Sequence, residues 1–84
     1  MREAFQTEHP HNLVLWNDDV TPADAVVEAL CMHLRYPLEK AVETMWYIHT
    51  NGRGVVYSGT FEVCELHYEQ LRSCKLTVTI EKPE

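Results

Sequence analysis

Three polar side chains, Asn17, Asp18 and His49, could together bind a positively charged group. A carboxylate only accepts hydrogen bonds, an amide offers its carbonyl oxygen, and a neutral imidazole offers one acceptor nitrogen. Asp19 adds a second carboxylate beside them. Each signal also has an ordinary structural explanation, because Asn and Asp favour turns before helices, and a lone histidine on an apolar helix stripe is usually structural. The set becomes informative only if the fold brings its members together.

A hydrophobic pocket would form beside these acceptors if the first two predicted helices pack side by side. An apolar hole with acceptors at its mouth suits an ammonium group attached to a hydrophobic side chain, as at a peptide's free N-terminus. Hydrogen bonds to a charged group are roughly twice as strong as neutral ones, and burying a Leu or Phe side chain contributes about 1.5–3 kcal/mol. The candidate lining residues are Thr21, Ala23, Val26, Met45 and Ile48.

The first positioning elements are a strand and a helix. The apolar run from Leu13 to Trp16 is typical of a strand that is central or buried on both faces. Thr21 is the expected N-cap of the helix that follows, with Pro22 at the first helical position. Because Pro37 disfavours the helical conformation in the residue before it, this helix should end near residues 35–36.

Pro37 can itself open a second helix, which Asn51 and Gly52 should end. A short strand over residues 54–57 is expected next, with Ser58 and Gly59 forming the turn after it.

Thr60 is the expected N-cap of a third helix. Residues 76–80 alternate apolar and polar side chains, which indicates a half-buried strand. The order is therefore β-α-α-β-α-β. We expect a compact α+β domain, with a three-stranded antiparallel sheet packed on one side by three helices.

Composition limits the possible partners. The chain has 84 residues and a formal charge of −6. Nucleic acid is not an expected partner, because nucleic-acid binders need clustered Lys and Arg. No apolar stretch approaches the roughly 18 residues of a membrane span, so no membrane partner is expected. Residues 1–11 are polar and aperiodic, and we expect a disordered lead there, followed by one domain over residues 12–82.

The three cysteines, Cys31, Cys64 and Cys74, form no C-x-x-C pair, and their odd number leaves one unpaired. This pattern favours reduced thiols in a cytosol-like compartment over a disulfide framework or a metal site. We therefore expect no bound metal and no cofactor.

Three stretches of the chain resemble the ClpS adaptor family: "LVLWNDDVTP" at residues 13–22, "VETMWYIHTNGRG" at residues 42–54, and the closing "KLTVTIEKP". The likeness covers residues 12–82 in the same order and spacing. The pairing of N-D-D-x-T-P with M-x-x-[VI]-H-x-x-G is specific. ClpS proteins are N-degron recognins, which bind destabilising N-terminal residues and deliver the substrates to a Clp AAA+ unfoldase and its ClpP-type peptidase.

The resemblance implies roles for particular residues. Asn17, Asp18 and His49 would hold the substrate's α-amino group, Asp18 through water, and Asp19 lies beside the site. Glu62 matches a residue that docks on the N-terminal domain of the unfoldase, and His67 stands where the family often has a basic residue. The implied pocket residues are Thr21, Ala23, Val26, Met45, Ile48 and Leu76.

Besides His67, three positions depart from the family pattern. Ala23 replaces a frequent methionine at the pocket rim, Ile48 replaces a common valine, and Val20 replaces a frequent aromatic residue. We expect the small Ala23 side chain to leave more room at the edge of the pocket. The additional methylene of Ile48 should narrow the deep part of the pocket.

The expected function is that of a monomeric adaptor for N-terminal Phe, Tyr, Trp and Leu, with Ile and Val as weaker ligands. The expected location is the bacterial cytoplasm or the plastid stroma. The alternative is a ClpS-like regulatory module that docks on the unfoldase and alters substrate choice without binding N-degrons. An enzyme is not expected, because no activated nucleophile or metal-ligand cluster accompanies Asp18, Asp19 and His49.

Overall fold

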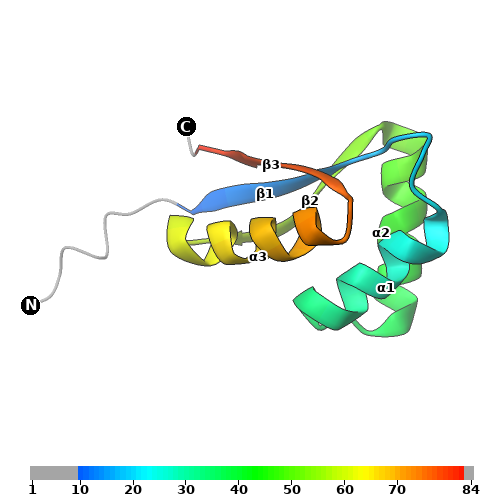
Figure 1. Cartoon of the computed structure of the whole chain (residues 1–84), viewed down its shortest axis with the longest axis horizontal. Helices are drawn as coiled ribbons and strands as arrows, with labels where there is room; N and C mark the ends of the chain where they lie inside the picture. Colours follow the sequence, from blue (N-terminus) through cyan, green and yellow to red (C-terminus); the bar gives the residue numbers. More distant parts are fainter. Residues whose placement is uncertain (1–9, 83–84) are drawn as a thin grey trace, which may run out of the picture.

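The computed structural model describes residues 10–82 and contains a three-stranded sheet with three helices (Figure 1). The expected α+β class, the three-stranded antiparallel sheet and the element order are confirmed. The predicted lead falls largely on residues 1–9, outside the described residues, and His11 already belongs to the first strand. The elements are β1 (His11–Trp16), α1 (Ala23–Leu34), α2 (Leu38–Asn51), β2 (Arg53–Gly59), α3 (Phe61–Ser73) and β3 (Thr77–Glu81).

Strand β1 is the central strand of the sheet, whose order is β2-β1-β3. It pairs antiparallel with both neighbours. Side chains on both faces of this strand are buried, in agreement with the continuous apolar run of its sequence. Leu13, Val14 and Leu15 are each at most 1% exposed.

The helices occupy two places relative to the sheet (Figure 1). Helix α3 lies along one face and contacts all three strands, whereas α1 and α2 form a hairpin beyond one end of the sheet. Helix α2 also contacts β2, and α1 also contacts α3. All three helices contribute to one core with the sheet, through Leu30, Ala41, Ile48, Cys64 and Leu71.

Two of the predicted helix boundaries have the expected chemistry. The Thr60 hydroxyl oxygen accepts a hydrogen bond from the Val63 backbone N–H at 3.3 Å, so Thr60 is the N-cap of α3. Gly52 ends α2 with φ of 91°, and its N–H donates to the Ile48 carbonyl at 2.8 Å. A positive φ is readily adopted by glycine, which has no Cβ to clash with the backbone.

The predicted cap of α1 is wrong by one residue. Pro22, with an extended ψ of 148°, holds the N-cap position, and no side chain caps the first turn. The Thr21 hydroxyl instead donates to the Asp18 carboxylate at 3.1 Å. The carboxylate is the stronger acceptor, and its bonds to the backbone of residues 20 and 21 fold the chain into a turn before the helix begins.

The predicted turn at Ser58 and Gly59 is also wrong, because both residues extend β2. They pair with Asn12 and His11 of β1. Strand β1 begins two residues earlier than the apolar run suggested, so it supplies these residues with ladder partners. The Ser58 hydroxyl adds a 2.6 Å hydrogen bond to the Asn12 side-chain oxygen.

Candidate functional site

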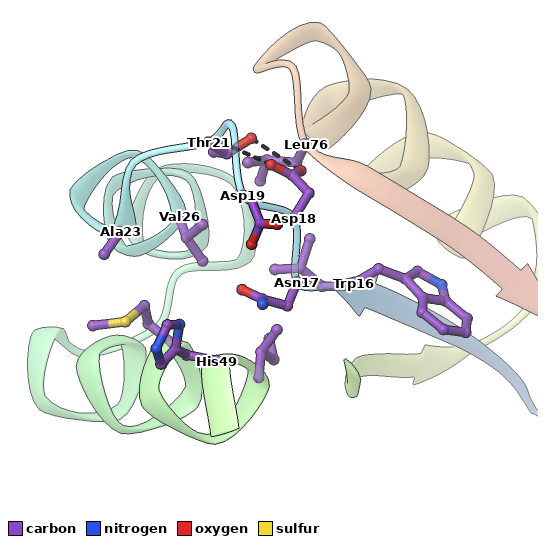
Figure 2. A pocket seen from close by; sticks show the side chains of 12 residues that line it. Trp16, Asn17, Asp18, Asp19, Thr21, Ala23, Val26, His49 and Leu76 are labelled. Carbon is purple, nitrogen blue, oxygen red and sulfur yellow. Dashed lines mark hydrogen bonds between the residues drawn. The ribbon is translucent and has the colours of Figure 1, made fainter. Parts of the chain in front are cut away.

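A cavity of about 240 Å³ opens where the end of β1 meets α1 and α2 (Figure 2). This is slightly below the roughly 300–1,000 Å³ of sites for drug-sized ligands, a size suited to one large side chain. All residues that were predicted as hydrogen-bond acceptors or as pocket residues line this cavity. These residues are Asn17, Asp18, Asp19, Thr21, Ala23, Val26, Met45, Ile48, His49 and Leu76.

The junction between β1 and α2 brings the acceptors together. The Asn17 backbone N–H donates to the Gly52 carbonyl at 2.9 Å, directly after α2 ends. His49 lies in the last turn of that helix. The hydrogen bond therefore holds the exit of β1 beside the end of α2, and the imidazole lies across the cavity mouth from the turn at residues 17–19 (Figure 2).

Asp18 is held by four hydrogen bonds from three residues. One carboxylate oxygen accepts from the backbone N–H groups of Val20 at 2.9 Å and Thr21 at 2.7 Å. The other accepts from the hydroxyls of Thr21 and Thr77, each at 3.1 Å. Since a carboxylate has about four lone-pair sites, these donors occupy it fully.

The same hydrogen bonds keep Asp18 charged. The Thr21 backbone N–H is the main cause that lowers the pKa of Asp18 below its ordinary value of 3.8, and the other three donors add to this effect. Partial burial acts in the opposite direction but does not prevail. Asp18 is thus a fixed negative charge at the cavity mouth.

Asn17, Asp19 and His49 differ from Asp18 because their side chains are exposed. Within the part of the chain that the structure describes, no protein group donates a hydrogen bond to these three side chains. The His49 ring contacts the edge of Trp46, with ring centroids 5.7 Å apart and planes at 86°. These side chains therefore retain acceptor atoms for a ligand.

The inner wall of the cavity is apolar. Ile48 from α2 and Leu76, which precedes β3, are each 3% exposed, and Val26 and Met45 are partly buried. Ala23 is exposed, as expected at a rim. A side chain inserted past the mouth would exchange water for hydrocarbon contacts.

Gly54 allows the Ile48 side chain to lie close to strand β2. A Cβ atom on Gly54 would lie 3.1 Å from Ile48 Cγ1 and 3.2 Å from Tyr47 Cδ1. Both distances are shorter than ordinary carbon contacts of about 3.5–4.0 Å. The absence of a side chain in β2 therefore lets α2 pack close to the sheet beneath the cavity.

Leu15 and Trp16 also line the cavity, although neither was named among the candidate site residues. The Trp16 indole N–H donates to the Thr79 hydroxyl at 2.8 Å, and the Arg53 guanidinium lies 4.8 Å from the ring centre. Arg53 in turn forms a 2.9 Å ion pair with Glu81. Trp16 could have been recognised as a site residue from its position, because it ends the strand directly before Asn17.

The two predicted docking residues lie on α3, away from the cavity. Glu62 is exposed in the first turn. His67 is partly buried, with its ring centroid 4.9 Å from that of Tyr57 and its Nδ1 atom 2.8 Å from Gln70 Oε1. Five residues correspond to about 500° of rotation at 3.6 residues per turn, so the two side chains point to different sides of the helix.

Residues 10–82 contain no group of three or more His, Cys, Asp or Glu side chains arranged to hold a metal ion. Among the same residues, no helix is both long and apolar enough to cross a membrane. All three cysteines are free thiols.

A family model described as "ATP-dependent Clp protease adaptor protein ClpS" matches residues 6–79. Among curated relatives, the Clp protease adapter protein ClpS of Bartonella quintana is 35% identical over 74 residues, which are 88% of this chain and 67% of that protein. The ClpS of Xylella fastidiosa (strain M12) is 39% identical over 61 residues, which are 73% of this chain and 58% of that protein. The chain thus spans about three fifths to two thirds of these relatives.

The fold also matches a solved structure, that of Agrobacterium tumefaciens ClpS2 bound to L-phenylalaninamide. The TM-score is 0.83 at 25% sequence identity, and the match covers 89% of this chain and 98% of the other. The bound compound in that structure carries an α-amino group and a hydrophobic side chain.

Proposed function

The chain belongs to the ClpS family of ATP-dependent Clp protease adaptor proteins, and from this premise we propose that it captures substrate proteins by a bulky hydrophobic N-terminal residue. The observation that carries this proposal is the cavity, which combines an apolar wall with a mouth of acceptors and negative charge. L-Phenylalaninamide, the ligand in the related ClpS2 structure, has the same two chemical parts as such an N-terminus.

The α-amino group would be bound by two kinds of interaction. Asn17, Asp19 and His49 supply acceptor atoms that no described protein group uses, so they can accept directly from the ammonium. Asp18 already accepts four hydrogen bonds, and it therefore contributes its negative charge across the mouth. The division of roles refines the expectation that Asn17, Asp18 and His49 act as one set.

The side chain of the first residue would enter the apolar cavity. Its burial contributes about 1.5–3 kcal/mol for a Leu or Phe side chain, which separates these residues from small or charged ones. An acetylated N-terminus lacks the charge and leaves the acceptors unpaired, and buried acceptors without partners cost affinity. Selectivity for a free N-terminus and for a bulky residue thus arises from different parts of one site.

We propose that the captured substrate passes to a Clp AAA+ unfoldase with its ClpP-type peptidase. Glu62, exposed on α3 away from the cavity, is the proposed contact to the N-terminal domain of the unfoldase. A role for His67 beside Glu62 stays a prediction, because the His67 ring already contacts Tyr57 and Gln70. The free thiols fit a reducing compartment such as the bacterial cytoplasm or the plastid stroma.

The proposal is tested with short fluorescent peptides that differ only in the first residue, measured by fluorescence anisotropy. Peptides beginning with Phe, Tyr, Trp or Leu should bind, those with Ile or Val should bind more weakly, and the N-acetylated Phe peptide should not bind. If the Phe peptide fails to bind while the protein still associates with the unfoldase domain, the alternative of a regulatory module holds instead. Cleavage of these peptides by the protein alone would contradict a pure adaptor.

A further inference from the structure

Cys74 and His33 form a thiol–imidazole pair outside the cavity. The Cys74 sulfur lies 3.4 Å from His33 Nε2, although the residues are 41 positions apart in the chain. Cys74 is the C-cap of α3, and His33 lies in the last turn of α1. The contact between these two helices therefore creates the pair, and both side chains are partly exposed.

A thiol and an imidazole at this distance have the geometry in which a base can assist a nucleophile. The thiolate is the reactive form of cysteine, and an imidazole nitrogen within hydrogen-bond reach can take the thiol proton. We propose that Cys74 is a site of oxidation by peroxides, with His33 as the group that assists, and that the oxidised side chain weakens ligand binding at the neighbouring cavity.

Cys74 borders a hollow that can admit a small oxidant. This second hollow, of about 570 Å³, lies next to the cavity and shares Asp18 and Thr21 with it. Its other lining residues are Val20, Pro22, Ala25, Cys74, Lys75 and Thr77. A group added to the Cys74 sulfur would thus occupy space beside the turn that carries the fixed negative charge.

The reaction is a two-electron oxidation. The imidazole accepts the thiol proton, and the thiolate attacks one oxygen of hydrogen peroxide and breaks the O–O bond. That oxygen, still carrying its hydrogen, becomes bonded to sulfur as a sulfenic acid. The other oxygen leaves as water after it takes up the proton. Sulfur is oxidised and the peroxide is reduced, and a thiol reductant reverses the change.

Polar contacts link residues 75–77, which follow Cys74, to Asp18 and Thr21. Thr77 donates to Asp18 at 3.1 Å. The Thr21 hydroxyl, which donates to Asp18, also lies 3.4 Å from the carbonyl of Lys75, the residue after Cys74. Lys75 has a positive φ of 70°, a conformation that non-glycine residues adopt only when their surroundings hold them there. A change at Cys74 therefore shifts a segment that holds Asp18 in place.

The first measurement is the rate of sulfenic acid formation, trapped with dimedone during exposure to hydrogen peroxide and located by peptide mass spectrometry. Cys31 is the matched control, because it is likewise partly buried and lies on the same helix as His33. Cys64 is a second control, since it is buried and its burial raises the pKa of the thiol.

We expect Cys74 to react at least about tenfold faster than either control thiol. His33→Gln should slow the Cys74 reaction by at least about tenfold and leave that of Cys31 unchanged. The comparison of the three thiols needs no variant, so it remains decisive if His33→Gln fails to fold. A Cys74 rate equal to or below that of Cys31 would overturn the proposal.

The second measurement is binding of L-phenylalaninamide before and after peroxide treatment, and it rests on the proposed function. Treated protein should bind at least about threefold more weakly, and Cys74→Ser protein should bind equally well before and after treatment. Unchanged binding by fully oxidised protein would overturn the regulatory effect. If untreated protein does not bind, the proposed function fails, whereas the dimedone result still decides the reactivity of Cys74.

Discussion

Asp18 and His49 lie at the mouth of one cavity, but the fold holds them in opposite ways. Asp18 sits in a turn and accepts hydrogen bonds from Val20, Thr21 and Thr77. His49 is exposed on the last turn of α2 and contacts Trp46 through an aromatic edge. Hydrogen bonds thus fix Asp18 on one side of the mouth, whereas the His49 side chain on the other side projects from the surface of a helix.

The difference separates stability from binding. Because the donors to Asp18 come from the loop before α1 and from β3, its carboxylate helps to join two parts of the chain. Removing it should affect both folding and ligand binding. His49 makes few contacts with the rest of the protein, so its removal should affect binding alone. Four substitution experiments test this contrast, ordered from the largest expected effect to the smallest.

Asp18→Ala should cause the largest loss. It removes the acceptor for the backbone N–H groups of Val20 and Thr21, which should lower the free energy of unfolding by about 1–2 kcal/mol. It also removes the fixed charge that faces the ligand, so affinity for L-phenylalaninamide should fall at least about tenfold. Thermal unfolding followed by circular dichroism and titration calorimetry measure the two effects.

Asp24→Ala is the matched control for this substitution, since Asp24 is an exposed aspartate in the first turn of α1 and does not line the cavity. The control should keep wild-type affinity and lose no more than about 1 kcal/mol of stability from its interaction with the helix dipole. Equal affinity and equal stability of the two variants would show that Asp18 contributes to neither ligand binding nor the turn before α1.

His49→Ala should weaken binding without weakening the fold. Loss of one charge-assisted hydrogen bond costs about 1.5–3 kcal/mol, or roughly a 10- to 150-fold lower affinity. The free energy of unfolding should stay within about 0.5 kcal/mol, as for other exposed substitutions. His67→Ala, on α3 away from the cavity, should leave affinity unchanged. A stable His49→Ala protein with wild-type affinity would remove His49 from the site.

Ala23→Met should change selectivity rather than overall affinity. Ala23 is exposed at the rim, so a methionine side chain there narrows the entrance above Val26 and Met45. Wide or β-branched first residues should suffer most, so binding of Ile and Val peptides should fall about threefold more than that of Leu peptides. One methylene of lost contact, about 0.8 kcal/mol, corresponds to roughly that ratio. Unchanged ratios across the peptide panel would place residue 23 outside the rim.

The smallest expected effect is a change in acid stability. The pKa of Asp18 is lowered in the folded protein, chiefly by the Thr21 backbone N–H. Its contribution to stability is therefore complete above the ordinary value of 3.8 and is lost as the pH falls from there through the folded-state pKa. Asp18→Asn should show a shallower loss of stability below about pH 4 than the unsubstituted protein. Ala23→Met, which changes no ionisable group, should retain the original slope.

The order of elements and most of the core could be predicted from the sequence because both depend on local patterns. The apolar run at residues 13–16 required a buried strand, and Thr60 and Gly52 marked helix ends through their own backbone chemistry. Local rules failed at Thr21, where a cap was expected, and at Ser58 and Gly59, where a turn was expected. At Thr21 the nearby Asp18 carboxylate accepts the hydroxyl hydrogen, and at Ser58 and Gly59 the early start of β1 supplies distant ladder partners.

The cavity required the tertiary structure, although the types of residue that line it were evident beforehand. Sequence determined that acceptors follow the first strand and that a histidine lies near the end of the second helix. Only the folded chain shows that a hydrogen bond from Asn17 to Gly52 holds the end of β1 beside the end of α2. It also shows that the Thr77 hydroxyl of β3 donates to the Asp18 carboxylate. The contact between Cys74 and His33 was likewise settled only by folding. Local patterns fix which groups a segment carries, whereas the distances between segments are set by how their buried faces pack.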